Sequence, residues 1–138
     1  MPGILIADDN ANIRILLRTT IETRPTLKVC GEAGNGAEAI ELATQLLPDL
    51  VLMDFSMPVV NGAIAASLLK KALPHIKVVL FTLHADIPTS LQRSLGIDLL
   101  IRKTEDVNQL PDKLLRLLSG ETTDSTTPPP PRAPTAIA

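Results

Sequence analysis

Five residues whose side chains could do chemistry stand at or just past the ends of short apolar segments. Asp8 and Asp9 follow one segment, Asp54 and Thr82 end two others, and Lys103 comes soon after the last. An ionised carboxylate beside an apolar core is costly unless a partner compensates its charge. The first question that the sequence raises is therefore what Asp54 binds or reacts with.

The segments that would position these residues alternate between two hydrophobic patterns. Short apolar runs with turn-like flanks predict strands over residues 4–7, 27–31, 50–53, 78–81 and 99–101. Apolar stripes at helical spacing predict helices over residues 13–21, 39–47, 64–72, 87–95 and 107–118. This alternation predicts a single doubly wound (βα)5 domain of the α/β class, with a parallel sheet covered by helices on both faces.

Several of the predicted helices carry signals at their ends. Asn35 opens the second helix with Glu38 three residues on, which resembles a capping box. Pro88 is tolerated in the first turn of the fourth helix, and Gly96 and Gly120 are suited to end the fourth and fifth helices. These signals support helices in the segments between the strands.

The candidate residues would meet at one edge of such a sheet, because ligands bind outside the carboxyl ends of parallel strands. Three carboxylates would converge there with one ammonium group, and two carboxylates about 4 Å apart repel by roughly 4 kcal/mol at an effective dielectric of about 20. Such a cluster persists if a cation binds it or if carboxyl pKa values rise. Mg²⁺ prefers hard oxygen ligands and is commonly held by one or two carboxylates plus a phosphate, so it is the expected metal.

The same arrangement suits phosphoryl transfer. A carboxylate beside a metal ion and a lysine is a suitable nucleophile, because this reaction mainly needs positioning and neutralisation of charge. We interpret Asp54 as the phosphoacceptor, Lys103 as a group that stabilises the transferring oxygens, and Thr82 as a hydroxyl that bonds to the phosphoryl product.

Five motifs of the sequence resemble those of a known family. Residues 1 to about 119 resemble the receiver domain of response regulators, through the motifs ILIADDN, NGAEAI, PDLVLMDFSMPVVNG, VVLFT and IRK, in that order. The resemblance implies a flavodoxin-like fold with strand order 2-1-3-4-5. It also implies that Asp9 and Asp54 bind Mg²⁺ directly, together with the backbone carbonyl of Ser56, whereas Asp8 acts through water.

The resemblance implies a regulatory protein rather than an enzyme. A phosphohistidine on a sensor histidine kinase or a phosphotransfer protein would give its phosphoryl group to Asp54, and slow autodephosphorylation would follow. Lys103 would pair with the phosphoryl oxygens, and Thr82 would move toward them on activation. The phosphorylated domain would then change its interaction with a partner or an output domain. The stretch LFTLHAD resembles a subclass that precedes a helix-turn-helix output domain.

Two features affect how phosphorylation would change the contacts of the domain with its partners. Leu100 stands where the family usually has Tyr or Phe, and a smaller side chain predicts a weaker switch. The fifth helix has a wider apolar surface than one buried stripe needs, formed by Leu114, Leu115, Leu117 and Leu118. This surface predicts a homodimer or another partner on the face of the fourth helix, fifth strand and fifth helix.

The composition excludes several classes of protein. The 138 residues are 45% hydrophobic and 20% charged with a formal net charge of −2, which fits one globular domain with a modest tail. The lack of a long basic run argues against direct binding of nucleic acid. Cys30 is the only cysteine, which excludes an intramolecular disulfide and a cysteine metal cluster. No secretory signal is recognised and no apolar run approaches the ~20 residues of a membrane span, so a cytoplasmic protein is expected.

Residues 121–138 differ in composition from the rest of the chain. They are rich in Pro and Thr and have almost no large apolar side chain, so they cannot bury enough surface to offset their ordering entropy. We predict a disordered tail or linker there, after a receiver domain of residues 1–120.

Two other functions compete with the phosphorylated switch. A pseudo-receiver would keep the fold and act as a phosphorylation-independent protein-interaction module, but the set of candidate residues is intact. A small hydrolase of the aspartyl-phosphate type would need a DxDx[TV] pattern on the first strand, which is missing. Gly31, Gly34 and Gly36 have the wrong order for a GxGxxG phosphate loop and are expected to serve turns and caps.

Overall fold

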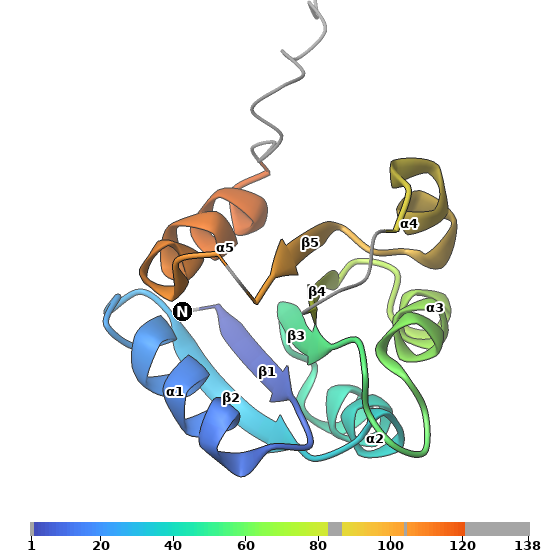
Figure 1. Ribbon diagram of the computed structural model, residues 1–138, viewed down its shortest axis with the longest axis horizontal. Coiled ribbons are helices and arrows are strands. Elements are labelled where there is room, and N and C mark those ends of the chain that lie inside the picture. Colours follow the sequence, from blue (N-terminus) through green and yellow to red (C-terminus); the bar gives the residue numbers. More distant parts are fainter. Residues whose placement is uncertain (1, 83–86, 104, 121–138) are drawn as a thin grey trace, which may run out of the picture.

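The computed structural model describes residues 2–82, 87–103 and 105–120 (Figure 1). Its strands are β1 (Gly3–Ala7), β2 (Lys28–Ala33), β3 (Leu50–Asp54), β4 (Lys77–Thr82) and β5 (Leu99–Arg102). Its helices are α1 (Ala11–Ile21), α2 (Gly36–Leu46), α3 (Gly62–Ala72), α4 (Thr89–Leu95), the 3₁₀ helix η1 (Val107–Gln109) and α5 (Leu110–Leu118). No helix within these ranges is long and apolar enough to cross a lipid bilayer. The tail predicted over residues 121–138 lies outside the described residues and stays a prediction.

The strands form one parallel sheet in the order β2-β1-β3-β4-β5. Asp54 pairs in register with Phe81 of β4, and Thr82 pairs with Arg102 of β5. The ends of β3, β4 and β5 are therefore level with one another at the carboxyl edge. The predicted α/β class, the doubly wound architecture and the strand order are all confirmed.

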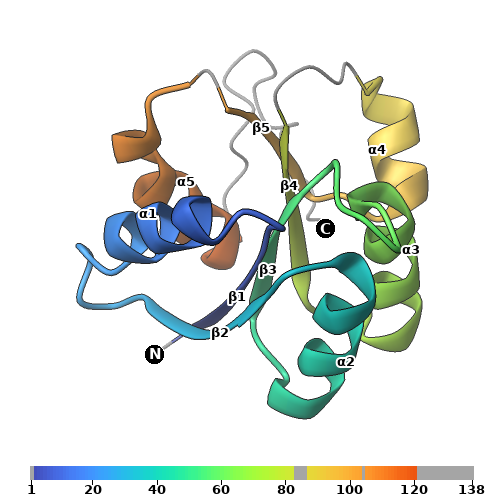
Figure 2. The ribbon, with the colours of Figure 1, turned by 60° about the horizontal axis from the view of Figure 1, so that its bottom comes forward.

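Different helices cover the two faces of the sheet: α1 and α5 lie on one side, and α2, α3 and α4 on the other (Figure 2). The alternation along β1 shows how the core divides. Ile4 and Ile6 join the cluster beneath α1 and α5, whereas Leu5 and Ala7 join the cluster beneath the other three helices. Because both faces are buried, the inner strands read as continuous apolar runs rather than as alternating patterns.

Asparagine side chains begin the first three helices. Asn10, Asn35 and Asn61 each accept a hydrogen bond from a backbone N–H in the first turn of α1, α2 and α3. The capping box predicted at α2 forms in altered form, because Glu38 accepts from the N–H of Gly34 at 2.6 Å, one residue before the cap. Asn35 itself accepts from the N–H of Glu38 at 2.8 Å.

Several element boundaries differ from those that the sequence predicted, and the differences at β2, α4 and the fifth helical segment are the most informative. β2 continues through Glu32 to Ala33 and begins at Lys28, so Leu27 lies before the strand. α4 begins at Thr89, and Pro88 is its N-cap rather than a residue of its first turn. The fifth helical segment opens as the 3₁₀ turn η1, because Pro111 follows closely and has no backbone N–H to donate.

Candidate functional site

Four of the strands deliver a candidate residue to the carboxyl edge of the sheet. Asp8 and Asp9 follow β1, Asp54 and Thr82 are the last residues of β3 and β4, and Lys103 follows β5. Asp8 is 1% exposed, Thr82 4% and Asp54 7%, whereas Asp9 faces solvent. Buried polar side chains need partners, and the contacts of this edge show which partners they have.

The three aspartates form a compact acidic cluster. One carboxylate oxygen from each of Asp8, Asp9 and Asp54 lies within 4.8 Å of the others. Asp8 Oδ2 is buried and accepts no hydrogen bond from any described residue. A hard divalent cation, or a water bound to one, would satisfy such an oxygen. The donor set therefore fits Mg²⁺ by its chemistry.

Lys103 is the residue of the described part of the chain that forms ion pairs with this cluster. Its Nζ lies 3.2 Å from Asp54 Oδ1 and 3.6 Å from Asp8 Oδ2. The backbone N–H of Lys103 also donates to the carbonyl oxygen of Thr82 at 2.6 Å, which anchors the start of its loop to the end of β4. One ammonium does not neutralise three carboxylates, so the cluster keeps an excess of negative charge.

Burial raises the pKa of the Asp8 carboxyl above its ordinary value and is the main cause of the change. The backbone N–H of Asn10, which donates to Asp8 Oδ1 at 2.9 Å, acts in the opposite direction. The negative charge of Asp54 raises the pKa of Asp8 further. The raised pKa of Asp8 thus includes a contribution from the carboxylate repulsion that the sequence predicted for converging strand ends.

The loop after Asp54 is closed by short backbone contacts. The N–H of Ser56 donates to Asp54 Oδ1 at 3.3 Å, and the N–H of Phe55 donates to the carbonyl of Phe81 at 3.1 Å. Where the loop returns, a Cβ atom on Gly62 would lie 2.5 Å from the carbonyl oxygen of Asp54. Only glycine fits there, so α3 can begin directly behind the candidate phosphoacceptor.

The middle of this loop contains a strained turn that the sequence did not reveal. Val59 has a φ of +72°, and the N–H of Val60 donates to the carbonyl of Pro58 at 2.8 Å, which closes a three-residue γ-turn. A β-branched residue is a marked outlier in this backbone region. The turn also presses on α2, since a Cβ atom on Gly36 would lie 2.1 Å from the carbonyl oxygen of Val60.

Sequence reasoning also missed a group of charged side chains on α1 and β2, one of which contacts the backbone of Asp8. Arg14 Nε lies 3.1 Å from Glu32 Oε1, and Arg18 Nε lies 2.7 Å from Glu32 Oε2. Arg14 Nη1 donates in addition to the backbone carbonyl of Asp8. The available signal was two arginines spaced by four residues on one helix, opposite a lone glutamate in an apolar strand.

The apolar surface predicted for α5 is largely used inside the domain. Leu114 and Leu117 are buried, and Leu115 and Leu118 are partly buried against the same core cluster. Leu100 on β5 is half-buried and packs against the cluster on the other face. The width of the leucine surface therefore gives less support to a docking face than the sequence indicated.

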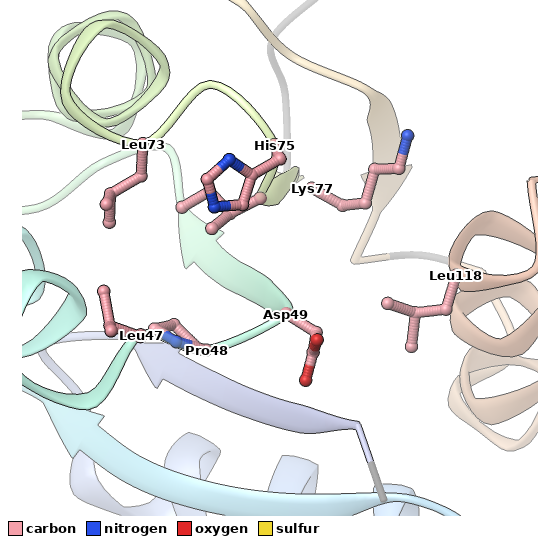
Figure 3. A pocket seen from close by; sticks show the side chains of 8 residues that line it. Leu47, Pro48, Asp49, Leu73, His75, Lys77 and Leu118 are labelled. Atoms are coloured by element: carbon pink, nitrogen blue, oxygen red, sulfur yellow. The ribbon is translucent and has the colours of Figure 1, made fainter.

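A cavity of about 380 Å³ lies at the opposite, amino edge of the sheet (Figure 3). Asp49, which precedes β3, and Lys77, which begins β4, line it together with His75 and Leu118. Ligands of doubly wound sheets bind at the carboxyl edge, where the acidic cluster is. We therefore place the candidate site at the acidic cluster and not in this cavity.

Comparison with known proteins decides the family. A family model described as the response regulator receiver domain matches residues 4–115. The chain belongs to the response regulator receiver domain family. This receiver domain is 35% identical over 120 residues to the response regulator protein VraR of Staphylococcus epidermidis, across 86% of this chain and 57% of that relative. It thus spans little more than half the length of the relative.

Solved receiver structures share this fold. A two-component response regulator of the LuxR family from Aurantimonas sp. SI85-9A1 matches with a TM-score of 0.82 and 27% identity, over 88% of each chain. The signal receiver domain of NarL from Mycobacterium tuberculosis matches with a TM-score of 0.80 and 25% identity, over 87% of this chain and 98% of that one. The predicted family, a regulatory family of two-component systems, is confirmed by these matches.

Proposed function

We propose that this receiver domain accepts a phosphoryl group on Asp54 from a phosphohistidine of a sensor histidine kinase or phosphotransfer protein. The observation that carries the proposal is the placement of Asp54, which is buried at the end of β3, 3.2 Å from Lys103 Nζ and in a cluster with Asp8 and Asp9. This placement combines a carboxylate nucleophile, a fixed cation and a set of hard oxygen ligands, as aspartyl phosphorylation requires.

In the proposed reaction a carboxylate oxygen of Asp54 attacks the phosphorus atom of the donor. The P–N bond to the donor imidazole breaks, its electron pair leaves with the imidazole, and a proton then restores the neutral ring. Lys103, whose Nζ already lies at Asp54 Oδ1, is placed to pair with the oxygens of the transferred group. Thr82, at the end of the adjacent strand, is proposed to bond to the phosphoryl product.

Asp9 and Asp54, with the backbone carbonyl of Ser56, are proposed to hold Mg²⁺ directly, and Asp8 to hold it through a water. The buried, unbonded Oδ2 of Asp8 supports this assignment. The bound ion would supply positive charge that offsets the negative charge of the transferring phosphoryl oxygens. The N–H of Ser56 holds Asp54 Oδ1 and so orients the carboxylate independently of any ion.

Intact mass measurement tests the phosphoacceptor assignment. The full chain, incubated with acetyl phosphate and Mg²⁺, should gain the mass of one phosphoryl group, whereas Asp54→Asn should gain none. Asp112→Asn is the matched control, because it removes the same charge from an α5 residue that forms an exposed ion pair with Arg24. A parent chain that takes up no phosphoryl group would instead support the pseudo-receiver, and label retained in Asp54→Asn would overturn the assignment.

A second measurement tests the metal assignment. Chelation of divalent ions should stop labelling, and Asp9→Asn should weaken Mg²⁺ binding while Asp112→Asn leaves it unchanged. If both substitutions have the same effect, the acidic cluster is not the ion site.

We also propose that the face of α4, β5 and α5 carries a homodimer or partner contact that phosphorylation tightens, and that the domain acts in the cytoplasm. Leu91 of α4 is 47% exposed. Leu100 is proposed to be a weak element of the switch, since its side chain fills less volume than an aromatic ring. Sedimentation with and without beryllofluoride, on the parent and on Leu100→Tyr, measures the association; a monomer in every state would contradict it.

A further inference from the structure

Arg14 makes two contacts through different nitrogens of its guanidinium group. Its Nε pairs with Glu32 Oε1 of β2 at 3.1 Å, and its Nη1 donates to the backbone carbonyl of Asp8. The side chain is 20% exposed, so it is largely buried. A planar guanidinium can make both contacts at once because its N–H groups are held in a rigid fork.

The contact with Asp8 acts on the backbone and therefore on two acidic residues together. The carbonyl of Asp8 and the N–H of Asp9 belong to one planar peptide unit. A hydrogen bond that holds this carbonyl fixes the orientation of the whole unit, and thus the direction in which the chain leads to Asp9. The N–H of Asp8 is held separately by the carbonyl of Ala33 at 3.0 Å.

Such restraint is needed because the cluster repels itself. Oxygens of Asp8, Asp9 and Asp54 lie within 4.8 Å of one another, and Asp9 is the exposed member of the three. Asp8 and Asp54 have Lys103 as a common partner, at 3.6 and 3.2 Å. Rotation of the peptide unit between Asp8 and Asp9 would let the exposed carboxylate move away from the other two.

Glu32 holds the Arg14 side chain in the orientation in which it contacts Asp8. It also pairs with Arg18 at 2.7 Å, so its two oxygens hold two arginines of the same helix face. Arg14 contacts the backbone carbonyl of Asp8 rather than its carboxylate, so this contact restrains the geometry of the chain there. Arg18 shares Glu32 but, within the described residues, makes no hydrogen bond or ion pair with Asp8, Asp9 or Asp54, so it provides a matched comparison.

We infer that Arg14 is a positioning residue for the divalent-cation site: it holds the Asp8–Asp9 peptide unit so that the two carboxylates converge with Asp54. The inference rests on the proposed function for the identity of the ion, but not on transfer of a phosphoryl group. It extends the site to α1 and to Glu32 of β2, which carry no expected ligand of the ion.

Titration calorimetry of the full, unphosphorylated chain with Mg²⁺ tests this inference. Arg14→Met should weaken Mg²⁺ binding by about 10- to 100-fold, the usual effect of losing a group that orients a metal ligand. Arg14→Lys should also weaken binding, because one ammonium does not reproduce the rigid fork. Arg18→Met, which loses an ion pair with the same Glu32, should bind Mg²⁺ as the parent does.

A comparison of Mg²⁺ and Ca²⁺ affinities separates a positioning role from a loss of stability, because a loss of stability alone would weaken binding of both ions alike. Mg²⁺ demands near-ideal octahedral geometry, whereas Ca²⁺ accepts flexible coordination. Arg14→Met should therefore lose more affinity for Mg²⁺ than for Ca²⁺, at a temperature where circular dichroism shows the variant folded. Should this variant not fold, Arg14→Lys serves for the same comparison.

Equal Mg²⁺ affinities in the Arg14 and Arg18 variants would overturn the inference, as would equal losses for Mg²⁺ and Ca²⁺. Failure of the proposed function looks different. In that case the parent binds Mg²⁺ and the variants keep their predicted order, but no phosphoryl mass appears on incubation with acetyl phosphate.

Discussion

Lys103 Nζ lies 3.2 Å from Asp54 Oδ1, although strand β4 separates the two strands that end near these residues. The long lysine side chain spans the intervening strand, and its ammonium lies 5.4 Å from the centre of the Phe81 ring on β4. This distance is within the range of cation–π attraction. The charge balance of the acidic cluster thus depends on Lys103, which follows the edge strand β5.

Lys103→Met should lower the free energy of unfolding by about 1–3 kcal/mol in metal-free buffer, because Asp8 and Asp54 lose their charged partner. Saturating Mg²⁺ should restore part of this loss, since an ion that binds only the folded state stabilises it. Denaturant unfolding with and without Mg²⁺ measures both effects. Lys113→Met, which removes a partly exposed pair with Glu105, should cost under about 1 kcal/mol, and this cost should be the same with and without Mg²⁺.

Asp8→Asn should stabilise the metal-free domain at neutral pH. The folded-state pKa of Asp8 is raised by burial above the ordinary value of 3.8, so the folded state binds its proton more tightly than the unfolded state. The contribution of Asp8 to stability is then fully present below pH 3.8 and is lost as pH rises through the folded pKa. Unfolding curves across pH should show the advantage of Asp8→Asn shrinking on acidification. An advantage that does not change with pH would contradict this explanation.

Gly36→Ala should destabilise the domain by about 1–3 kcal/mol, the usual cost of forcing extra volume into a packed contact. Its new Cβ atom would meet the carbonyl oxygen of Val60 at 2.1 Å. Gly34→Ala is the control, because the nearest atom to its Cβ would be Glu38 Oε1 at 3.7 Å. Thermal unfolding of both variants measures the difference, and similar midpoints would show that α2 can move away from the loop.

Val59→Gly should stabilise the domain by about 1 kcal/mol, since glycine adopts a positive φ without the steric cost that a β-branched residue has. Val60→Gly should instead lower stability, because Val60 packs against the core cluster on the α2–α3 face. Denaturant unfolding compares the two variants. If Val59→Gly is no more stable than the parent, the γ-turn holds no appreciable strain.

Deletion of residues 122–138 should shift the thermal midpoint by no more than about 2 °C, which is well under 1 kcal/mol for a domain of this size. The reason is compositional, as these residues have few apolar groups to bury. Differential scanning calorimetry of the two lengths measures the shift. A larger fall would mean that the tail packs on the domain.

The edge at which the site forms was predictable because its signal is local. A fully buried strand is a short apolar run, so the first polar residue after it marks the strand end, as Asp8 and Asp54 do. Parallel topology then brings such ends to one edge, and the structure places Asp8, Asp9, Asp54 and Lys103 together there. The roles assigned to these residues and to Thr82 and Ser56 stay predictions.

Other features were not predictable because distant parts of the chain determine them. β2 was expected to end before Glu32, since a charged residue breaks an apolar run. Arg14 and Arg18 of α1 compensate that charge and let the strand continue. The positive φ of Val59 depends on how the loop closes between Asp54 and Gly62, which no local pattern of residues specifies.

The cavity at the amino edge offers a place to attach a fluorescent label. Strands of five or six residues separate it from the acidic cluster, a distance of roughly 15–20 Å at about 3.3 Å per residue. His75 at its rim is exposed, whereas Cys30 is half-buried and burial raises the pKa of its thiol. A cysteine introduced by His75→Cys should therefore react with maleimides faster than the native thiol. A fluorophore attached there would report on the amino edge of the sheet without contacting the acidic cluster at the carboxyl edge.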